Sequence, residues 1–152
     1  MRYFSAALII TILLQGCSVR NAFSKLEISE EQENAIENTR SGKMQIDEKV
    51  GGIFSVMYLN DVYPNMNRTT NYFYISIYVK DKNEELIISS NGQKPLKIKT
   101  LPHDNKFTRL LPMQSEWATN YLVSFDNNKK KGINMLIESG QFSSGQLNYS
   151  RE

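Results

Sequence analysis

Cys17, the single cysteine of this 152-residue chain, is the side chain best suited to covalent chemistry. It directly follows the small residue Gly16 at the end of an apolar run. A thiol is the best side-chain nucleophile for forming a thioether bond to a diacylglycerol, so this position predicts attachment of lipid to Cys17. Because the chain has no second cysteine, disulfides and structural zinc sites built from thiolates are excluded.

The segment before Cys17 has the anatomy of a secretory signal, with Arg2 followed by apolar residues from Phe4 to Leu14. That run of about eleven residues gives roughly 17 Å of helix, which is too short to span ~30 Å of hydrocarbon. The residues Leu14-Gln15-Gly16-Cys17 resemble the lipobox of bacterial lipoproteins. The resemblance implies a cleaved signal peptide over residues 1–16 and stable anchoring by two or more acyl chains, such as palmitate.

This anchor also predicts the location of the protein. Ser18 follows the cysteine, and in the sorting scheme of Gram-negative lipoproteins a residue other than aspartate there implies the outer membrane. We therefore expect a cell-envelope protein, bound to the outer membrane by lipid and facing the periplasm or the exterior. The alternative is a secreted protein with a free thiol, which would be a reactive liability in an oxidising compartment.

The other reactive side chains do not form a recognisable catalytic set. His103, the sole histidine, precedes Asp104 in a proline-containing turn, a combination typical of an exposed loop. No HExxH motif, Asp-rich calcium loop or glycine-rich phosphate loop occurs, and the Ser144-Gly145 region lacks the GxSxG elbow. The sequence therefore predicts no catalytic residue, no metal site and no cofactor, in a protein that is not an enzyme. A formal net charge of only +2 argues against nucleic acid as a partner.

Residues 17–43 are polar and predict a tether that leads into a short helix. Ser29 and Gln32 have the spacing of a capping box, while Arg40 and Gly42 supply stop signals. The helix would carry a narrow apolar stripe made of Leu26, Ile28, Ala35 and Ile36. The folded domain is then expected to occupy residues 44–152.

From Met44 onward the hydrophobic period becomes two, which is typical of strands. The clearest alternation places one set of apolar side chains, Phe73, Ile75, Ile77 and Val79, opposite a second set, Tyr72, Tyr74, Ser76 and Tyr78. The segment Ile53–Leu59 is apolar on both faces, which predicts a central strand. Gly51-Gly52 before it predicts a bulge or bend.

Two hairpins and a final strand complete the predicted sheet. Asn91-Gly92 predicts a turn between strands at 85–90 and 96–101, and a polar connection joins strands at 121–125 and 133–137. Residues 141–149 would return as the last strand, with Gly145 as a weak point. About seven short strands at this spacing predict an all-β sandwich, with a closed barrel as the alternative.

The strands also carry a resemblance to a class of proteins. Val56-Met57-Tyr58-Leu59-Asn60 and Tyr121-Leu122-Val123-Ser124-Phe125 resemble strands of small, poorly characterised Gram-negative lipoproteins with one immunoglobulin-like β-sandwich. The resemblance implies a lipid-anchored envelope protein that functions in adhesion or assembly, and it carries no catalytic residues across.

Tyr72, Tyr74 and Tyr78 would project from one face of the best-defined strand and are the predicted partner-binding residues. Tyrosine is favoured at recognition surfaces, but also on a sheet face covered by a loop or helix. Trp117 is predicted to plug the core. We expect an interaction module for a protein or surface partner. The alternatives are a carrier of a small apolar or lipidic ligand, and a hydrolase with acidic residues converging in one pocket.

Overall fold

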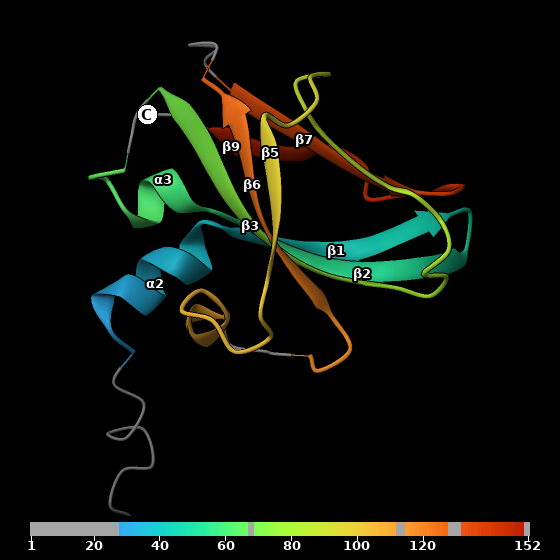
Figure 1. Ribbon diagram of the computed structural model, residues 1–152, viewed down its shortest axis with the longest axis horizontal. Helices are drawn as coiled ribbons and strands as arrows, with labels where there is room; N and C mark the ends of the chain where they lie inside the picture. The colour runs from blue at the N-terminus through green and yellow to red at the C-terminus, as the bar shows by residue number, and fades with distance from the viewer. Residues whose placement is uncertain (1–27, 67–68, 112–114, 128–131, 151–152) are drawn as a thin grey trace, which may run out of the picture.

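A computed structural model of the protein describes residues 28–66, 69–111, 115–127 and 132–150 (Figure 1). Within these ranges most of the chain is β-strand, so the prediction of an all-β protein is confirmed. The helical elements are α2 (Glu30–Glu37), α3 (Leu59–Val62) and the 3-10 helix η2 (Thr108–Leu110). The strands are β1 (Thr39–Ile46), β2 (Lys49–Tyr58), β3 (Thr70–Val79), β4 (Leu86–Ser90), β5 (Lys97–Leu101), β6 (Thr119–Asp126), β7 (Gly132–Ser139), β8 (Phe142–Ser143) and β9 (Leu147–Ser150).

All described strands belong to one antiparallel sheet with the order β4-β7-β8-β1-β2-β3-β6-β5, and β9 pairs with β7 beside this path. The sheet curls, so that the strands around β7 lie across the long strands β2 and β3 (Figure 1). Tyr149 of β9 packs against the rings of Tyr58 and Phe73 at centroid distances of 6.0 and 5.5 Å. The two halves of the sheet therefore face each other across a shared apolar layer.

That layer, which we call the inner core, explains the period-two pattern of β3. Phe73, Ile75 and Ile77 are all at most 2% exposed and point into it, as the alternation predicts. The other buried members are Met44, Phe54, Val56, Tyr58, Ile88, Val123, Phe125, Ile133, Met135, Ile137 and Tyr149. Because these residues come from both halves of the sheet, hydrophobic burial drives the curl.

β2 is central, as its two-sided hydrophobicity predicts, and lies between β1 and β3. Its register with β1 shifts at the predicted position: Met44 pairs with Gly52, and Gln45 pairs with Val50, which leaves Gly51 as an extra residue. A Cβ atom on Gly51 would lie 2.2 Å from the ring of Phe142. The glycine at this bulge therefore gives β8 room to approach β1.

Both predicted hairpins are wrong in their pairing. β4 pairs with β7 and β5 pairs with β6, at opposite ends of the sheet. Asn91 and Gly92 do turn the chain with φ of 51° and 76°. However, the Asn91 N–H donates to the carbonyl of Asn134 at 2.7 Å, and Ile88 is buried beside Ile137 in the inner core. Nonlocal burial thus overrides the local turn signal.

The second hairpin fails for a related reason. β6 pairs with β3 on one edge and β5 on the other, so no edge remains for β7. The predicted last strand is divided at Gly145, whose φ is 67°, into β8 and β9, and both pair with β7.

The amino-terminal helix begins as predicted: Ser29 Oγ accepts from the Gln32 N–H, and Gln32 Oε1 accepts from the Ser29 N–H. It ends at Glu37, and the predicted stop residues Arg40 and Gly42 belong instead to β1, which begins before Met44. Of the predicted apolar stripe, Ala35 is fully buried, whereas Ile28 and Ile36 are exposed. Leu26, Cys17 and the signal segment lie outside the described residues. No helix in the described ranges has the length and apolar character needed to cross a bilayer.

Candidate functional site

The outer face of the sheet, opposite the inner core, carries the candidate site. Strand register aligns Ser41, Ser55 and Ser76 in one row across β1, β2 and β3. The next row contains Lys43, Ile53 and Tyr78, and the row on the other side contains Thr39, Met57 and Tyr74. This face therefore changes from serine-rich to aromatic within a few residues along each strand.

A second apolar cluster, the outer core, covers the Met57–Tyr74 row. Helix α2, helix α3 and the segment 102–111 lie over this end of the sheet (Figure 1). The buried members of the outer core are Ala35, Met57, Leu59, Val62, Tyr74, Phe107, Leu110 and Leu111. This cover leaves the Ser55 row and the Ile53 row without a layer above them.

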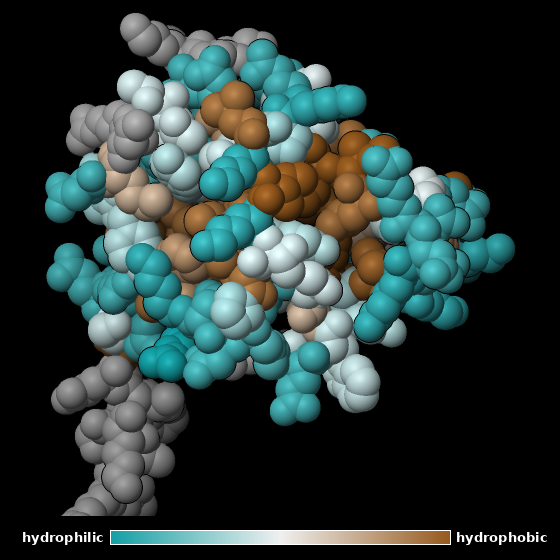
Figure 2. Space-filling model, viewed as in Figure 1, coloured by the Kyte–Doolittle hydropathy of each residue, from teal (hydrophilic) through white to brown (hydrophobic). Residues whose placement is uncertain are grey.

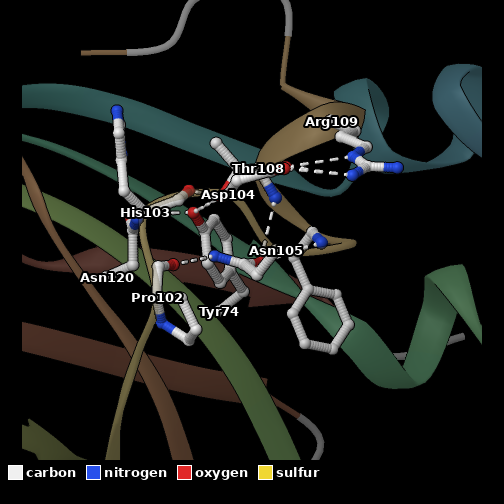
Figure 3. Close-up of polar contacts among 9 residues, drawn as sticks. Tyr74, Pro102, His103, Asp104, Asn105, Thr108, Arg109 and Asn120 are labelled. Carbon is white, nitrogen blue, oxygen red and sulfur yellow. Dashed lines mark hydrogen bonds and ion pairs between the residues drawn. The ribbon is translucent and has the colours of Figure 1, made fainter. Parts of the chain in front are cut away.

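Buried hydrogen bonds fix the covering segment in place (Figure 3). Tyr74 Oη donates to Asn120 Oδ1 at 2.9 Å and lies 3.0 Å from Thr108 Oγ1. Thr108 Oγ1 in turn donates to the carbonyl of His103 at 2.9 Å. Tyr74, Thr108 and Asn120 are each at most 4% exposed. Because buried hydrogen-bonded groups are costly to separate, this network anchors the segment 102–111 to β3 and β6.

The same segment is further organised by Asn105. Its Oδ1 accepts the N–H groups of Phe107 and Thr108 at 3.0 and 3.2 Å, which starts η2, and its Nδ2 donates to the Pro102 carbonyl at 2.8 Å. The predicted exposure of His103 is confirmed. Asp104 and Arg109 form an exposed ion pair of 3.1 Å, which lowers the pKa of the carboxyl and raises that of the guanidinium.

Tyr63 connects α2 to the loop after α3. Its hydroxyl donates to Glu31 Oε1 at 2.5 Å, and the Lys106 ammonium lies 5.1 Å from its ring centroid. Burial, followed by the bond to Glu31, raises the pKa of Tyr63 far above its ordinary value, so the phenol stays protonated. These contacts hold the cover of the outer core and place no reactive group in the groove described next.

The uncovered part of the outer face is a groove of about 420 Å³ beside α2. Its described lining is mainly apolar and hydroxyl-bearing: Ile36, Thr39, Ser41, Gly42, Ile53, Phe54, Ser55 and Leu111. A smaller hollow of about 110 Å³ continues it over β3 and shares Ile53, Phe54 and Ser55 with it. The hollow adds Ser76, Tyr78, Ser115 and Ala118 to the lining. We call the two together the outer groove.

The described lining of the outer groove has hydroxyl groups but no carboxylate, imidazole or amine. Ser41 Oγ and Ser55 Oγ lie 2.7 Å apart and bond to each other. The described lining therefore offers apolar contact and neutral hydrogen bonds to a ligand. Within the described residues, no cluster of three or more His, Cys, Asp or Glu side chains could hold a metal ion.

Trp117 lies between Ser115 and Ala118, two residues of the groove lining, and is 76% exposed. The prediction that it plugs the core is therefore wrong. The Trp117 N–H donates to Ser115 Oγ at 3.3 Å, and the Ala118 N–H donates to the Ser115 carbonyl at 3.1 Å. This tight turn precedes β6, and the side chain of Trp117 is exposed on it.

The structure separates the three tyrosines proposed as a binding set. Tyr74 is fully buried in the outer core, so it cannot contact a partner without removal of the cover. Tyr72 packs partly buried against the outer core, and Tyr78 lines the outer groove. The covered-face alternative thus holds for Tyr74, while binding by Tyr72 and Tyr78 stays a prediction.

Ile36 and Ile53 line the groove and Trp117 is exposed, whereas the sequence pattern places Ile36 on the apolar stripe of the helix, Ile53 in a central strand and Trp117 in the core. The exposure of Ile53 could have been predicted from the sequence, because Ser55 lies on the same face of the strand and indicates contact with solvent. Comparison of the chain with protein-family models, with curated proteins and with solved structures found no match.

Proposed function

We propose that this protein is a non-catalytic interaction module, held on the cell envelope by lipid on Cys17, that binds a protein partner through the outer groove. The observation that carries the proposal is that Trp117, 76% exposed, lies in the chain between Ser115 and Ala118, which line a groove that also contains Ile53, itself 48% exposed. Exposed aromatic residues next to apolar pockets are typical anchors of protein interfaces.

The surroundings of Trp117 support the same function. The serine row on the groove floor offers neutral hydrogen bonds, and Tyr78 adds a ring with a polar tip. The Tyr74–Thr108–Asn120 network holds the segment 102–111, which forms one wall of the outer groove, in place in the free protein. A rigid wall lowers the entropy cost of binding, which favours recognition of a folded partner.

Placement at the envelope rests on the amino-terminal residues. Lipid on Cys17 would leave residues 18–29 as a tether before α2. Fully extended, this tether is roughly 40 Å long at most. The groove could then reach partners close to the membrane, in a role in adhesion or envelope assembly. Mass spectrometry of the protein purified from membranes would test this anchor, because an unmodified Cys17 thiol would refute it.

A photo-crosslinking amino acid at position 117 tests the binding surface in native membranes. We expect a discrete crosslinked product that disappears when Ile53→Glu is added, since the bound partner would have to bury the unpaired carboxylate. The control places the same crosslinker at Ile87, which is 48% exposed on β4, away from the groove. Equal products from both positions, or a product unaffected by Ile53→Glu, would contradict the proposal.

We further propose that the curled sheet is a distorted immunoglobulin-like sandwich. One layer would be β5-β6-β3-β2-β1 and the other β4-β7-β9, joined through the short strand β8. The single aligned pair between β1 and β8, Gln45 with Ser143, supports treating the halves as two layers. The alternative of a closed barrel would need β4 to pair with β5, and no such pairing occurs among the described strands.

The outer groove also favours a second function, transport of a small apolar or lipidic ligand. Its lining includes the exposed side chains of Ile36 and Ile53, and its volume of about 420 Å³ fits a drug-sized molecule. Native mass spectrometry of the full chain would distinguish the two functions. A retained lipid that is lost in Ile53→Glu supports the carrier, whereas groove-dependent crosslinking without a retained lipid supports the interaction module.

A further inference from the structure

The two ends of the sheet path are β4 and β5, which lie close in sequence but do not pair with each other. β5 pairs with β6 through residues 97–101 and has no second partner strand in the described parts of the chain. A terminal strand presents backbone N–H and C=O groups along its free edge, where another strand can add. β5 is the more open end, since its residues from Lys97 to Thr100 are all exposed.

Along β5, lysines on one face of the sheet alternate with uncharged side chains on the other face. Lys97 and Lys99 share the register rows of Ser124 and Leu122 on the outer face. Neither lysine forms an ion pair with a carboxylate among the described residues. Ile98, between them, is aligned with the inner-core residue Val123 but is 46% exposed, and Leu96 just before the strand is 66% exposed. The edge is therefore cationic on one face and apolar on the other.

The inner core is incomplete beside this edge. Tyr121 of β6, which is aligned with Thr100 of β5, packs against the inner core but is only partly buried. Figure 2 shows hydrophobic side chains open to solvent in a hollow on the face where Figure 1 places β5, with hydrophilic side chains on both sides. A strand added along β5 would thus cover apolar surface and also pair the free backbone groups.

We propose that β5 accepts an extended polypeptide segment as an added strand, with acidic residues opposite Lys97 and Lys99 and an apolar residue opposite Ile98. Directly opposed side chains on one face of a sheet are the pairs that stabilise it, so two carboxylates would satisfy the two lysines. Backbone pairing supplies affinity, and alternating side chains supply specificity. This site is separate from the outer groove and does not depend on its function.

The charges decide against a second copy of this chain as the occupant. Pairing β5 with β5 of another molecule would bring Lys97 and Lys99 near the same lysines of the partner strand, which is destabilising. Lysines on an edge strand also discourage unspecific strand addition. An acidic guest converts that repulsion into attraction.

The test uses the full chain in detergent and a fluorescent peptide with the core Glu-Val-Glu-Val-Glu. The comparison peptides are Lys-Val-Lys-Val-Lys and the shuffled core Glu-Glu-Val-Val-Glu. We expect binding of the alternating acidic peptide alone, accompanied by slower hydrogen exchange of backbone amides in β5. Equal binding of the shuffled peptide, or unchanged exchange in β5, would overturn the proposal.

Charge reversal gives the sharper comparison. Lys97→Glu with Lys99→Glu should weaken binding of the acidic peptide about tenfold and should create binding of the lysine peptide. The matched control, Lys43→Glu with Lys49→Glu, changes two exposed lysines on β1 and β2 and should alter neither affinity. If the control pair weakens binding equally, net charge rather than β5 recruits the peptide and the proposal is wrong.

Discussion

The hydroxyl of Tyr149 donates to the backbone carbonyl of Val56 at 2.9 Å, and this bond joins β9 to β2 across the inner core. Tyr149 is 3% exposed, and the Arg40 guanidinium lies 5.5 Å from its ring centroid. The contact links residues far apart in sequence and holds together the two halves of the curled sheet.

Replacing Tyr149 with Phe removes this bond while keeping the ring. We expect the free energy of unfolding to fall by about 1 kcal/mol, since the Val56 carbonyl loses a buried donor. Chemical denaturation of the two proteins would measure the difference. Tyr72→Phe is the matched control, because Tyr72 is only partly buried, and it should change stability less.

The burial of Tyr149 should also make the stability of the protein depend on alkaline pH. Burial raises the pKa of Tyr149 above its ordinary value near 10, and the positive charge of Arg40 opposes this only in part. Above pH 10 the unfolded chain therefore loses the phenolic proton while the folded chain keeps it, so stability falls as pH rises. Between pH 8 and about 11, the free energy of unfolding measured by chemical denaturation should fall less steeply in Tyr149→Phe than in the native protein. Parallel curves for the two proteins would exclude Tyr149 as a source of the loss.

Gly51→Ala should destabilise the bulge opposite β8. The new Cβ would lie 2.2 Å from the Phe142 ring, so either the ring or the backbone must move, at a cost of about 1–3 kcal/mol. Gly132→Ala is the control, since its nearest neighbour lies 3.8 Å away, and it should be tolerated. In thermal denaturation, the Gly51 effect should shrink when Phe142→Ala is already present. An undiminished effect in that background would show that the clash with Phe142 is not its cause.

Tyr74→Phe should loosen the segment that walls the outer groove. Asn120 Oδ1 loses its donor inside the protein, which we expect to cost about 1–2 kcal/mol. A double-mutant cycle with Thr108→Val should give a nonadditive result, because the two side chains belong to one network. Asp104→Asn breaks only the exposed ion pair and should leave stability nearly unchanged. Additive effects at Tyr74 and Thr108 would contradict the coupling.

The sequence by itself determined the features that depend on neighbouring residues. The capping box at Ser29, the alternation of β3, the bulge at Gly51 and the turn at Asn91 each follow from local backbone geometry or side-chain periodicity. These determinants act over a few residues, so a single sequence displays them.

Tertiary structure alone decided which strands pair and which apolar residues reach the surface. β4 and β5 flank a turn, yet burial of Ile88 against β7 places them at opposite ends of the sheet. Tyr74 and Tyr78 share one strand face, but the segment 102–111 covers only Tyr74. Trp117 is a large apolar residue of the kind found in cores, yet it is exposed because its turn lies outside the segment 102–111 that covers Tyr74. Residue type sets how much free energy burial would yield, but only the packing of distant segments determines where burial occurs.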